Sequence, residues 1–447
     1  MSHPYLPHTP EERRKMLAVL GLRDQEELLA PIPPALRLAR PPALPEALSE
    51  AELIRGFHAL ARMNVNLVEH PCFLGAGAYQ HHIPAVVDHL AGRAEFYTAY
   101  TPYQPEMSQG MLQAIFEFQT MIAELCGLPV ANASLYDGAT AAAEAALMAI
   151  GATGRTKILV ARTLHPEYRD VIRTYLRFRE VEPIELPVGA GRLRADALPL
   201  DTGVAALIVG YPNFFGQIED LGALAEAVHA VGASLIVAAN PVALGLLEAP
   251  GRLGADLVIG EGQPLGSPPN FGGPGLGFMA CRDGFLRRMP GRLVGRTVDG
   301  KGRHGYVLTL QTREQHIRRE RATSNICSNA ALLALRATIY LAAVGPDGLH
   351  EVAAQCAGAA RHALHRLTRC KGFVPLFDGP FFHEFALRSP VPVGELNAAL
   401  REHGIIGGLD LAPYYPEFGQ AVLLAVTEVR SAAEIEELAQ VMEAIAC

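Results

Sequence analysis

The chain contains no tryptophan and only four lysines, against thirty-four arginines. The four primary amines stand at Lys15, Lys157, Lys301 and Lys371. Any chemistry that needs a nucleophilic side-chain amine is therefore confined to four positions, and each can be assessed separately.

Paired cysteines and long runs of one charge are absent as well. The seven cysteines include no CxxC pair, which argues against a zinc site or a disulfide framework and predicts reduced thiols in a cytoplasm. The net charge of −8 and the interruption of the arginine cluster 313–321 by Glu314 and Glu320 argue against a nucleic-acid surface.

Signals for a membrane or for export are also missing. No apolar run reaches the roughly 18 residues that a bilayer span requires. The N-terminal residues 1–16 are polar, contain acids, and lack the apolar core of a signal peptide and the composition of a transit peptide. We therefore expect a cytoplasmic protein that does not engage a membrane.

The 447 residues exceed the usual size of a single hydrophobic core, and three regions are predicted. Residues 1–65 start with a helix that has Thr9 as its N-cap and Pro10 at its first position. A proline-rich connector follows at 31–48, and a second helix begins at Ser49. Such a connector is stiff and extended, so it is expected to lie along the surface of a partner.

Residues 66–330 alternate short apolar runs with alanine-rich segments. The runs at 157–162, 204–210, 234–240 and 255–260 have strand length, and 221–232 is helical in pattern. Strands buried on both faces and joined by helices predict a mainly parallel sheet. The apolar run 330–344 predicts a core helix, and the segments that follow it predict a smaller α+β lobe over 331–447.

Residues 97–109 concentrate polar groups between prolines. Three tyrosines, two glutamines, a glutamate and a serine stand beside Pro102 and Pro105, as expected for a wall that presents fixed polar groups to a ligand. The candidate pocket or interface residues are Tyr97, Thr98, Tyr100, Thr101, Tyr103, Gln104, Glu106, Ser108 and Gln109. Two alternatives stay open: the tyrosine rings pack a subunit interface, and Glu106 pairs with an arginine or caps the next helix rather than moving a proton.

The segment Tyr97–Ala145 closely resembles the N-terminal half of the glycine cleavage system P-protein, a pyridoxal-phosphate (PLP) glycine decarboxylase. The segment Leu310–Asn329 agrees with it, and the resemblance extends over essentially the whole chain. This second block supplies weaker candidates, each expected to serve an interface or the fold: Arg313, His316, Arg318 and Asn325. The resemblance implies the fold-type-I, aspartate aminotransferase-like architecture, with a mainly parallel sheet in a large domain and a smaller α+β C-terminal domain.

Enzymes of that fold hold PLP with a lysine, with an aspartate at a strand end, and with a phosphate loop at a helix N-terminus. Gln263-Pro264 stands where the catalytic subunit of the family has its His-Lys pair, and no acid occurs between Ser234 and Leu247. Asp137-Gly138-Ala139-Thr140 retains the form of a phosphate loop, although it also reads as an ordinary helix cap. We therefore predict that this chain anchors no PLP, with Pro264 at the Schiff-base position.

Other motifs are weak. The glycine-rich stretches 75–77 and 271–277 lack the GxGxxG spacing of a dinucleotide site. His81-His82, and His304 with His316, lack the spacing of metal ligands, so no metal site is predicted.

The resemblance implies the α subunit of a two-subunit glycine dehydrogenase (decarboxylating). Its β subunit would carry PLP in an α2β2 assembly, glycine would lose its carboxyl group, and the aminomethyl group would pass to the lipoyl group of H-protein. Because this chain ends soon after the predicted small lobe, the second half is expected on a separate polypeptide. The alternative is a non-catalytic structural or regulatory homologue.

Overall fold

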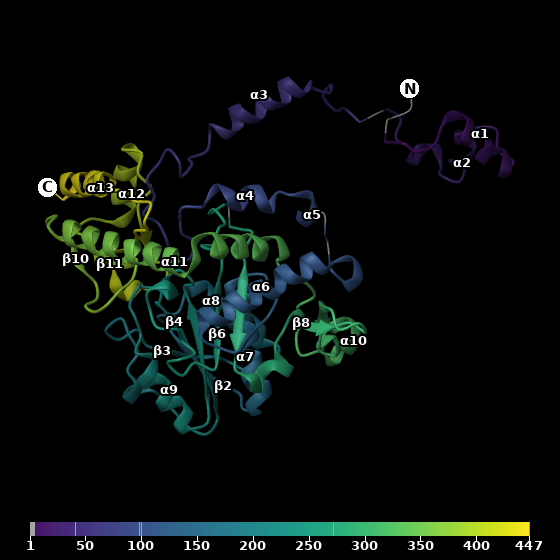
Figure 1. Ribbon diagram of the computed structural model, residues 1–447. Coiled ribbons are helices and arrows are strands. Elements are labelled where there is room, and N and C mark those ends of the chain that lie inside the picture. The colour runs from purple at the N-terminus through teal and green to yellow at the C-terminus, as the bar shows by residue number, and fades with distance from the viewer. Residues whose placement is uncertain (1–4, 41, 98, 100, 271, 447) are drawn as a thin grey trace. The chain divides into compact units, whose positions relative to one another are not determined.

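The computed structural model describes residues 5–40, 42–97, 99, 101–270 and 272–446, with Tyr97 described by its backbone only (Figure 1). Internal contacts divide the chain into two units, Met1–Val65 and Asn66–Cys447. The predicted division at residue 330 lies inside the second unit and stays a prediction.

The first unit contains α1 (Pro10–Val19), α2 (Gln25–Leu28) and α3 (Glu50–Ala61). Capping boxes at Thr9 and Ser49 start α1 and α3, so both predicted helix starts are confirmed. The connector has one 3₁₀ turn at Pro34–Leu36 and no regular structure over residues 42–49.

The second unit is built on a seven-stranded sheet with the order β1-β7-β6-β5-β4-β2-β3 (Figure 1). Its strands are β1 (Val130–Ala131), β2 (Lys157–Ala161), β3 (Ile184–Leu186), β4 (Val204–Tyr211), β5 (Ser234–Ala239), β6 (Leu257–Glu261) and β7 (Gly277–Cys281). Neighbours from β3 to β6 pair in parallel, and β7 is antiparallel to β6 and β1. The mainly parallel sheet and its four predicted strands are confirmed.

Helices cover both faces of this sheet, because alternate strand residues point to opposite sides. One face packs against α7 (Gly138–Thr153) and α8 (Pro166–Arg177). The other packs against α6 (Gln109–Cys126), α9 (Leu221–Ala230) and α11 (Ala331–Leu367). The carboxyl ends of β4, β5 and β6 meet at one edge, where sheets of this kind bind ligands.

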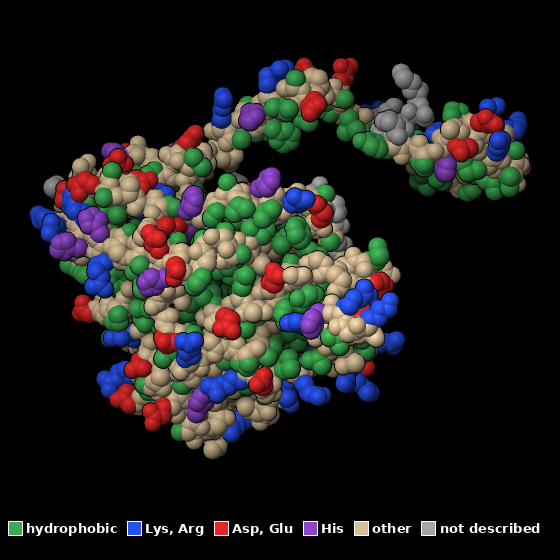
Figure 2. Space-filling view, in the orientation of Figure 1, with side chains coloured by type: hydrophobic (Ala, Val, Ile, Leu, Met, Phe, Trp, Pro, Cys, Tyr) green, Lys and Arg blue, Asp and Glu red, His purple; other side chains and the backbone are tan. Residues whose placement is uncertain are grey.

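The long helix α11 is divided at Gly345, whose backbone is non-helical. Its N-terminal half is predicted to be core, and Ala334, Ala337 and Tyr340 are buried there, whereas Leu332 is 45% exposed. A groove of about 500 Å³ runs between this half, α4 (Ala85–Ala91) and α6, and Val86, Leu90 and Ile339 help to line it. Figure 2 shows hydrophobic side chains gathered over α4 and α11. Among the described helices α11 alone is long and apolar enough to cross a bilayer, a test that core helices of soluble proteins also pass.

The remaining elements include the smaller α+β lobe and a hairpin. An antiparallel sheet has the order β10-β11-β13-β12. The lobe comprises β10 (Val374–Pro375), β11 (Glu384–Arg388), α12 (Val393–Glu402), β12 (Leu409–Asp410), β13 (Ala421–Ala425) and α13 (Ala432–Ile445). Outside it lie α5 (Ala94–Tyr97), α10 (Gln315–Arg318) and the hairpin of β8 (Leu293–Val298) and β9 (His304–Thr309).

Candidate functional site

A small cavity of about 80 Å³ lies at the carboxyl ends of β4, β5 and β6. Residues 212–214, 238–241, 260–261 and Pro264 supply its sheet side, and α8 and the start of β11 close it. Its polar lining includes Tyr79, His165, Tyr168, Asn240, Glu261, His383 and Glu384. This is the position in which the resemblance places a PLP site.

Pro264 lines the cavity, at the position assigned to the Schiff-base lysine. The neighbouring Gln263 is used structurally: its amide accepts from the backbone N–H of Tyr79 and donates to the Tyr79 carbonyl, both at 3.0 Å. None of the four lysines lines the cavity. Because proline has no amine, the chain offers no covalent anchor here.

The end of β5 carries an amide where a PLP enzyme of this fold has an acid. Asn240 Oδ1 accepts from the backbone N–H groups of Val242 and Ala243 at 2.9 and 3.2 Å. Its Nδ2 lies 3.4 Å from Nε2 of His383, and burial lowers the pKa of that histidine to about 3. This corner is therefore neutral and cannot stabilise a protonated pyridine.

The N-terminus of α7 is capped and occupied. Asp137 is the N-cap and accepts from Thr140 N–H at 2.7 Å, so the helix-cap alternative holds. The first helical N–H, that of Gly138, donates to Glu261 Oε2 at 3.1 Å. With no lysine, no acid at the end of β5 and a carboxylate at the helix N-terminus, the residues of this cavity do not fit PLP.

Glu384 is a second carboxyl at the cavity and is 3% exposed. It accepts from the Tyr79 hydroxyl at 2.6 Å and from Ala76 N–H at 2.7 Å. Burial raises the pKa of Glu384 to about 7, although these two hydrogen bonds oppose the rise. The folded chain therefore keeps this proton to a higher pH than the unfolded chain does.

A consequence is a pH-dependent stability difference between the wild type and Glu384→Gln. Since the folded pKa lies above the ordinary value of 4.5, the wild type loses stability as pH rises from about 4.5 to 7, on the order of 3 kcal/mol. The amide does not titrate, so we expect the variant to gain on the wild type over this range in urea unfolding. His383 titrates in both proteins and cancels. A constant difference across the range would contradict the raised pKa.

Two side chains of the described loop 101–109 tie it to the β8–β9 hairpin and to Arg292 just before it. Gln109 donates to the carbonyls of Pro105 and Tyr306 at 2.7 and 2.9 Å and accepts from Tyr306 N–H at 2.9 Å. The Tyr103 hydroxyl accepts from Arg292 Nη2 at 3.2 Å, and this guanidinium lies 5.4 Å from the ring centroid. These contacts make the loop a fixed structure.

The other loop candidates differ in their environment. Gln104 and Glu106 are exposed and make no side-chain hydrogen bond or ion pair to any described residue, while Thr101 and Ser108 are half-buried. Glu106 therefore neither pairs with an arginine nor caps α6 within the described residues. Thr98 and Tyr100 lie outside the described residues, as does the side chain of Tyr97.

The second matching block is mainly structural. Arg313 donates to the carbonyls of Gly291 and Leu310, each at 3.0 Å, and also contacts the Met289 carbonyl. Arg318 donates to the Thr312 carbonyl at 3.0 Å, and exposed His316 lies 3.6 Å from Glu314. Asn325 lines a surface pocket above α7.

Sequence reasoning missed Arg292, which links the two matching blocks. This arginine is 3% exposed, contacts Tyr103 on one side, and donates to Asn329 Oδ1 at 3.2 Å on the other. No motif surrounds it, so no sequence signal identifies it.

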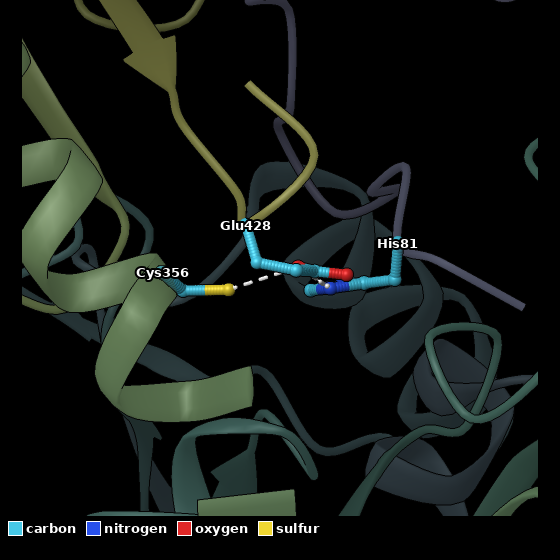
Figure 3. Close-up of side chains that lie close together, drawn as sticks. All are labelled: His81, Cys356 and Glu428. Atoms are coloured by element: carbon cyan, nitrogen blue, oxygen red, sulfur yellow. Dashed lines mark hydrogen bonds and ion pairs between the residues drawn. The ribbon is translucent and has the colours of Figure 1, made fainter. Parts of the chain in front are cut away.

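A buried cluster joins residues that the sequence keeps far apart (Figure 3). His81 Nδ1 lies 2.8 Å from Glu428 Oε2, and Cys356 Sγ donates to the same oxygen at 3.1 Å. Burial opposes ionisation of Glu428, but the hydrogen bond and charge of His81 lower its pKa to about 2. The three polar atoms lie within 4.8 Å of one another, and Glu428 Oε2 accepts from the other two. The cluster therefore holds the segment around residue 81 to α11 and the small lobe.

Comparison with known proteins agrees with this architecture. The family "Glycine cleavage system P-protein" matches residues 3–442. The probable glycine dehydrogenase (decarboxylating) subunit 1 of Moorella thermoacetica is 54% identical over 443 residues, 99% of each chain. The corresponding protein of Desulforamulus reducens is 53% identical over 443 residues, again 99% of each chain.

Solved structures indicate the same family and fold. An inhibitor-bound glycine decarboxylase (P-protein) of the glycine cleavage system superposes with a TM-score of 0.91 at 46% identity, covering 99% of this chain and 100% of that one. An aspartate aminotransferase from Thermus thermophilus, 19% identical with a TM-score of 0.59 over 84% of this chain and 99% of that one, shares the fold. The fold-type-I prediction is confirmed, and the chain belongs to the glycine cleavage system P-protein family.

Proposed function

We propose that this chain is the non-PLP-anchoring subunit of a two-subunit glycine dehydrogenase (decarboxylating). Relatives of the same length are named subunit 1 of that enzyme, which supports a second subunit in the complex. The observation that carries the assignment is Pro264, which lines the cavity where a lysine would be needed. PLP then belongs to the β subunit, where it supplies an electron sink for the decarboxylation of glycine.

The contribution of this chain is a preorganised wall. The loop 101–109 is held by Arg292 and Tyr306, while Gln104 and Glu106 are exposed and bonded to no other described side chain, so they can face a partner. Such groups orient a substrate or a lipoyl amide and exclude water without competing chemistry. The acceptor in this proposal is the lipoyl group of H-protein, the assembly is α2β2, and the location is cytoplasmic. The six described cysteines are unpaired, in keeping with that location.

The decisive experiment uses the purified chain with and without the β subunit. Alone, with excess PLP, it is expected to show no absorbance of lysine-bound PLP and no stoichiometric label after borohydride reduction, because Pro264 replaces the lysine. With the β subunit, we expect PLP binding and glycine–bicarbonate exchange. Stoichiometric labelling of any of the four lysines would refute the proposal.

The same experiment separates the alternative of a non-catalytic structural or regulatory homologue. In that case the rate of glycine–bicarbonate exchange by the β subunit, or by a single-chain P-protein, would be the same with and without this chain. A rate that requires both chains favours the proposed subunit. In this experiment, increasing amounts of this chain are added to β subunit that has been purified without it. The exchange rate then shows how activity depends on the ratio of the two chains.

A further inference from the structure

The misfit between this cavity and PLP includes more than a missing lysine. Glu261 stands at the end of β6, and its carboxylate accepts from three converging backbone N–H groups. The donors are Gly138 at 3.1 Å, Gln263 at 3.0 Å and Leu276 at 2.6 Å. They come from the first residue of α7, from the turn after β6, and from the loop before β7.

This arrangement has the properties of an anion site. The N-terminus of a 16-residue helix carries a partial positive charge, and N–H groups that converge on one point bind phosphate or carboxylate oxygens. Asp137 caps the same helix end and adds a second negative charge beside Glu261.

The local packing leaves no room for side chains at two glycines beside Glu261. A Cβ on Gly138 would lie 1.8 Å from the Tyr168 hydroxyl oxygen and 2.9 Å from the Glu261 nitrogen. A Cβ on Gly275 would lie 3.2 Å from Glu261 Oε2 and 3.0 Å from Asp137 Cβ. The backbone at Gly275 therefore packs closely against the Glu261 carboxylate, and the backbone at Gly138 packs against the Tyr168 phenol and the end of β6.

We infer that the N-terminus of α7 is an anion site of the phosphate-monoester class, and that Glu261 fills it from within the chain. This internal anion excludes the phosphate of a cofactor independently of Pro264. It also keeps the three N–H donors paired, which a vacant site would not. The inference depends on the contacts of Glu261 alone and not on whether the chain takes part in glycine decarboxylation.

Opposing effects act on the pKa of Glu261. Burial raises the pKa of Glu261, the three N–H donors lower it, and the charge of Asp137 raises it again. Tyr168, whose phenol lies against Gly138, is kept neutral because burial and the charge of Glu261 raise its pKa. The phenol therefore contributes no further charge.

The test is whether removing the internal anion creates a site for an external one. Thermal unfolding of the full-length chain is measured in inorganic phosphate, with the ionic strength held constant by chloride, for wild type and Glu261→Ala. We expect Glu261→Ala to melt at a lower temperature than wild type without phosphate. Its Tm should then rise by roughly 2–6 °C as phosphate reaches about 50 mM, while the wild-type Tm stays constant.

Glu384→Gln is the matched control, because it removes a carboxylate at the same cavity that is not bonded to α7. It should show no dependence on phosphate, and equilibrium dialysis should find one bound phosphate per chain in Glu261→Ala alone. The inference is overturned if Glu261→Ala shows no more dependence than the control, or if wild type binds phosphate equally well. A Glu261→Ala chain that folds in neither phosphate nor chloride also counts against it, since the external anion should restore the filled site.

Discussion

Replacing Gln104 by alanine or Glu106 by glutamine is expected to slow glycine–bicarbonate exchange by roughly ten- to a thousand-fold, while assembly and PLP content stay intact. Both side chains are exposed and unpartnered among the described residues. Their loss should therefore cost little folding stability, within about 0.5 kcal/mol. The rest of the loop is fixed by Gln109 and Tyr103, so the two groups are presented in a defined geometry. The same result is expected for Tyr100, which lies outside the described residues.

Two controls make the comparison sharp. Glu226→Gln on α9 and Gln355→Ala on α11 remove the same groups from other exposed positions, and they should exchange at the wild-type rate. Tyr103→Phe removes the hydroxyl bonded to Arg292 and tests whether anchoring of the loop matters separately. A group acting in the transition state lowers kcat, whereas one that only binds raises KM. If all loop variants assemble and turn over normally, the loop is an interface element.

Much of the fold follows from local signals. The capping boxes at Thr9 and Ser49 start helices where predicted, and the four apolar runs of the central region form β2, β4, β5 and β6. The core prediction for the N-terminal half of α11 holds for Ala334, Ala337 and Tyr340 but not for Leu332, because composition alone does not show which face of an apolar helix is buried. Its apolar groove with α4 and α6 appears only when the helices are placed together.

The candidate site, too, could be predicted only in part from the sequence. The missing lysine and acid are visible in the sequence, because each belongs to a position that the family motif defines. The contacts of Glu261 with Gly138, of Glu384 with Tyr79 and of His81 with Glu428 join residues 123, 305 and 347 positions apart. No local pattern marks such pairs, so their chemistry emerges only from the folded chain.

The N-terminal unit presents apolar surface without a core of its own. Among the hydrophobic side chains of its described residues only Leu17 is buried. In α3, Leu53, Ile54, Phe57 and Leu60 follow helical spacing and are 47–64% exposed. Figure 2 shows this hydrophobic stripe along one side of the helix. An apolar stripe of this kind beside a stiff connector is typical of a segment that packs on another chain.

Deleting residues 1–48 is therefore expected to weaken or abolish the complex with the β subunit, while the Asn66–Cys447 unit keeps its fold. The loss should be large, because an arm of this length adds to an interface above ~2,000 Å² in total. Sedimentation velocity measures assembly, and circular dichroism checks the fold of the truncated chain. Phe57→Ser extends the test to α3, with Arg55→Ser, on the opposite side of that helix, as its control. If the truncated chain and the β subunit still sediment together as a complex of the same stoichiometry, this role for the arm is ruled out.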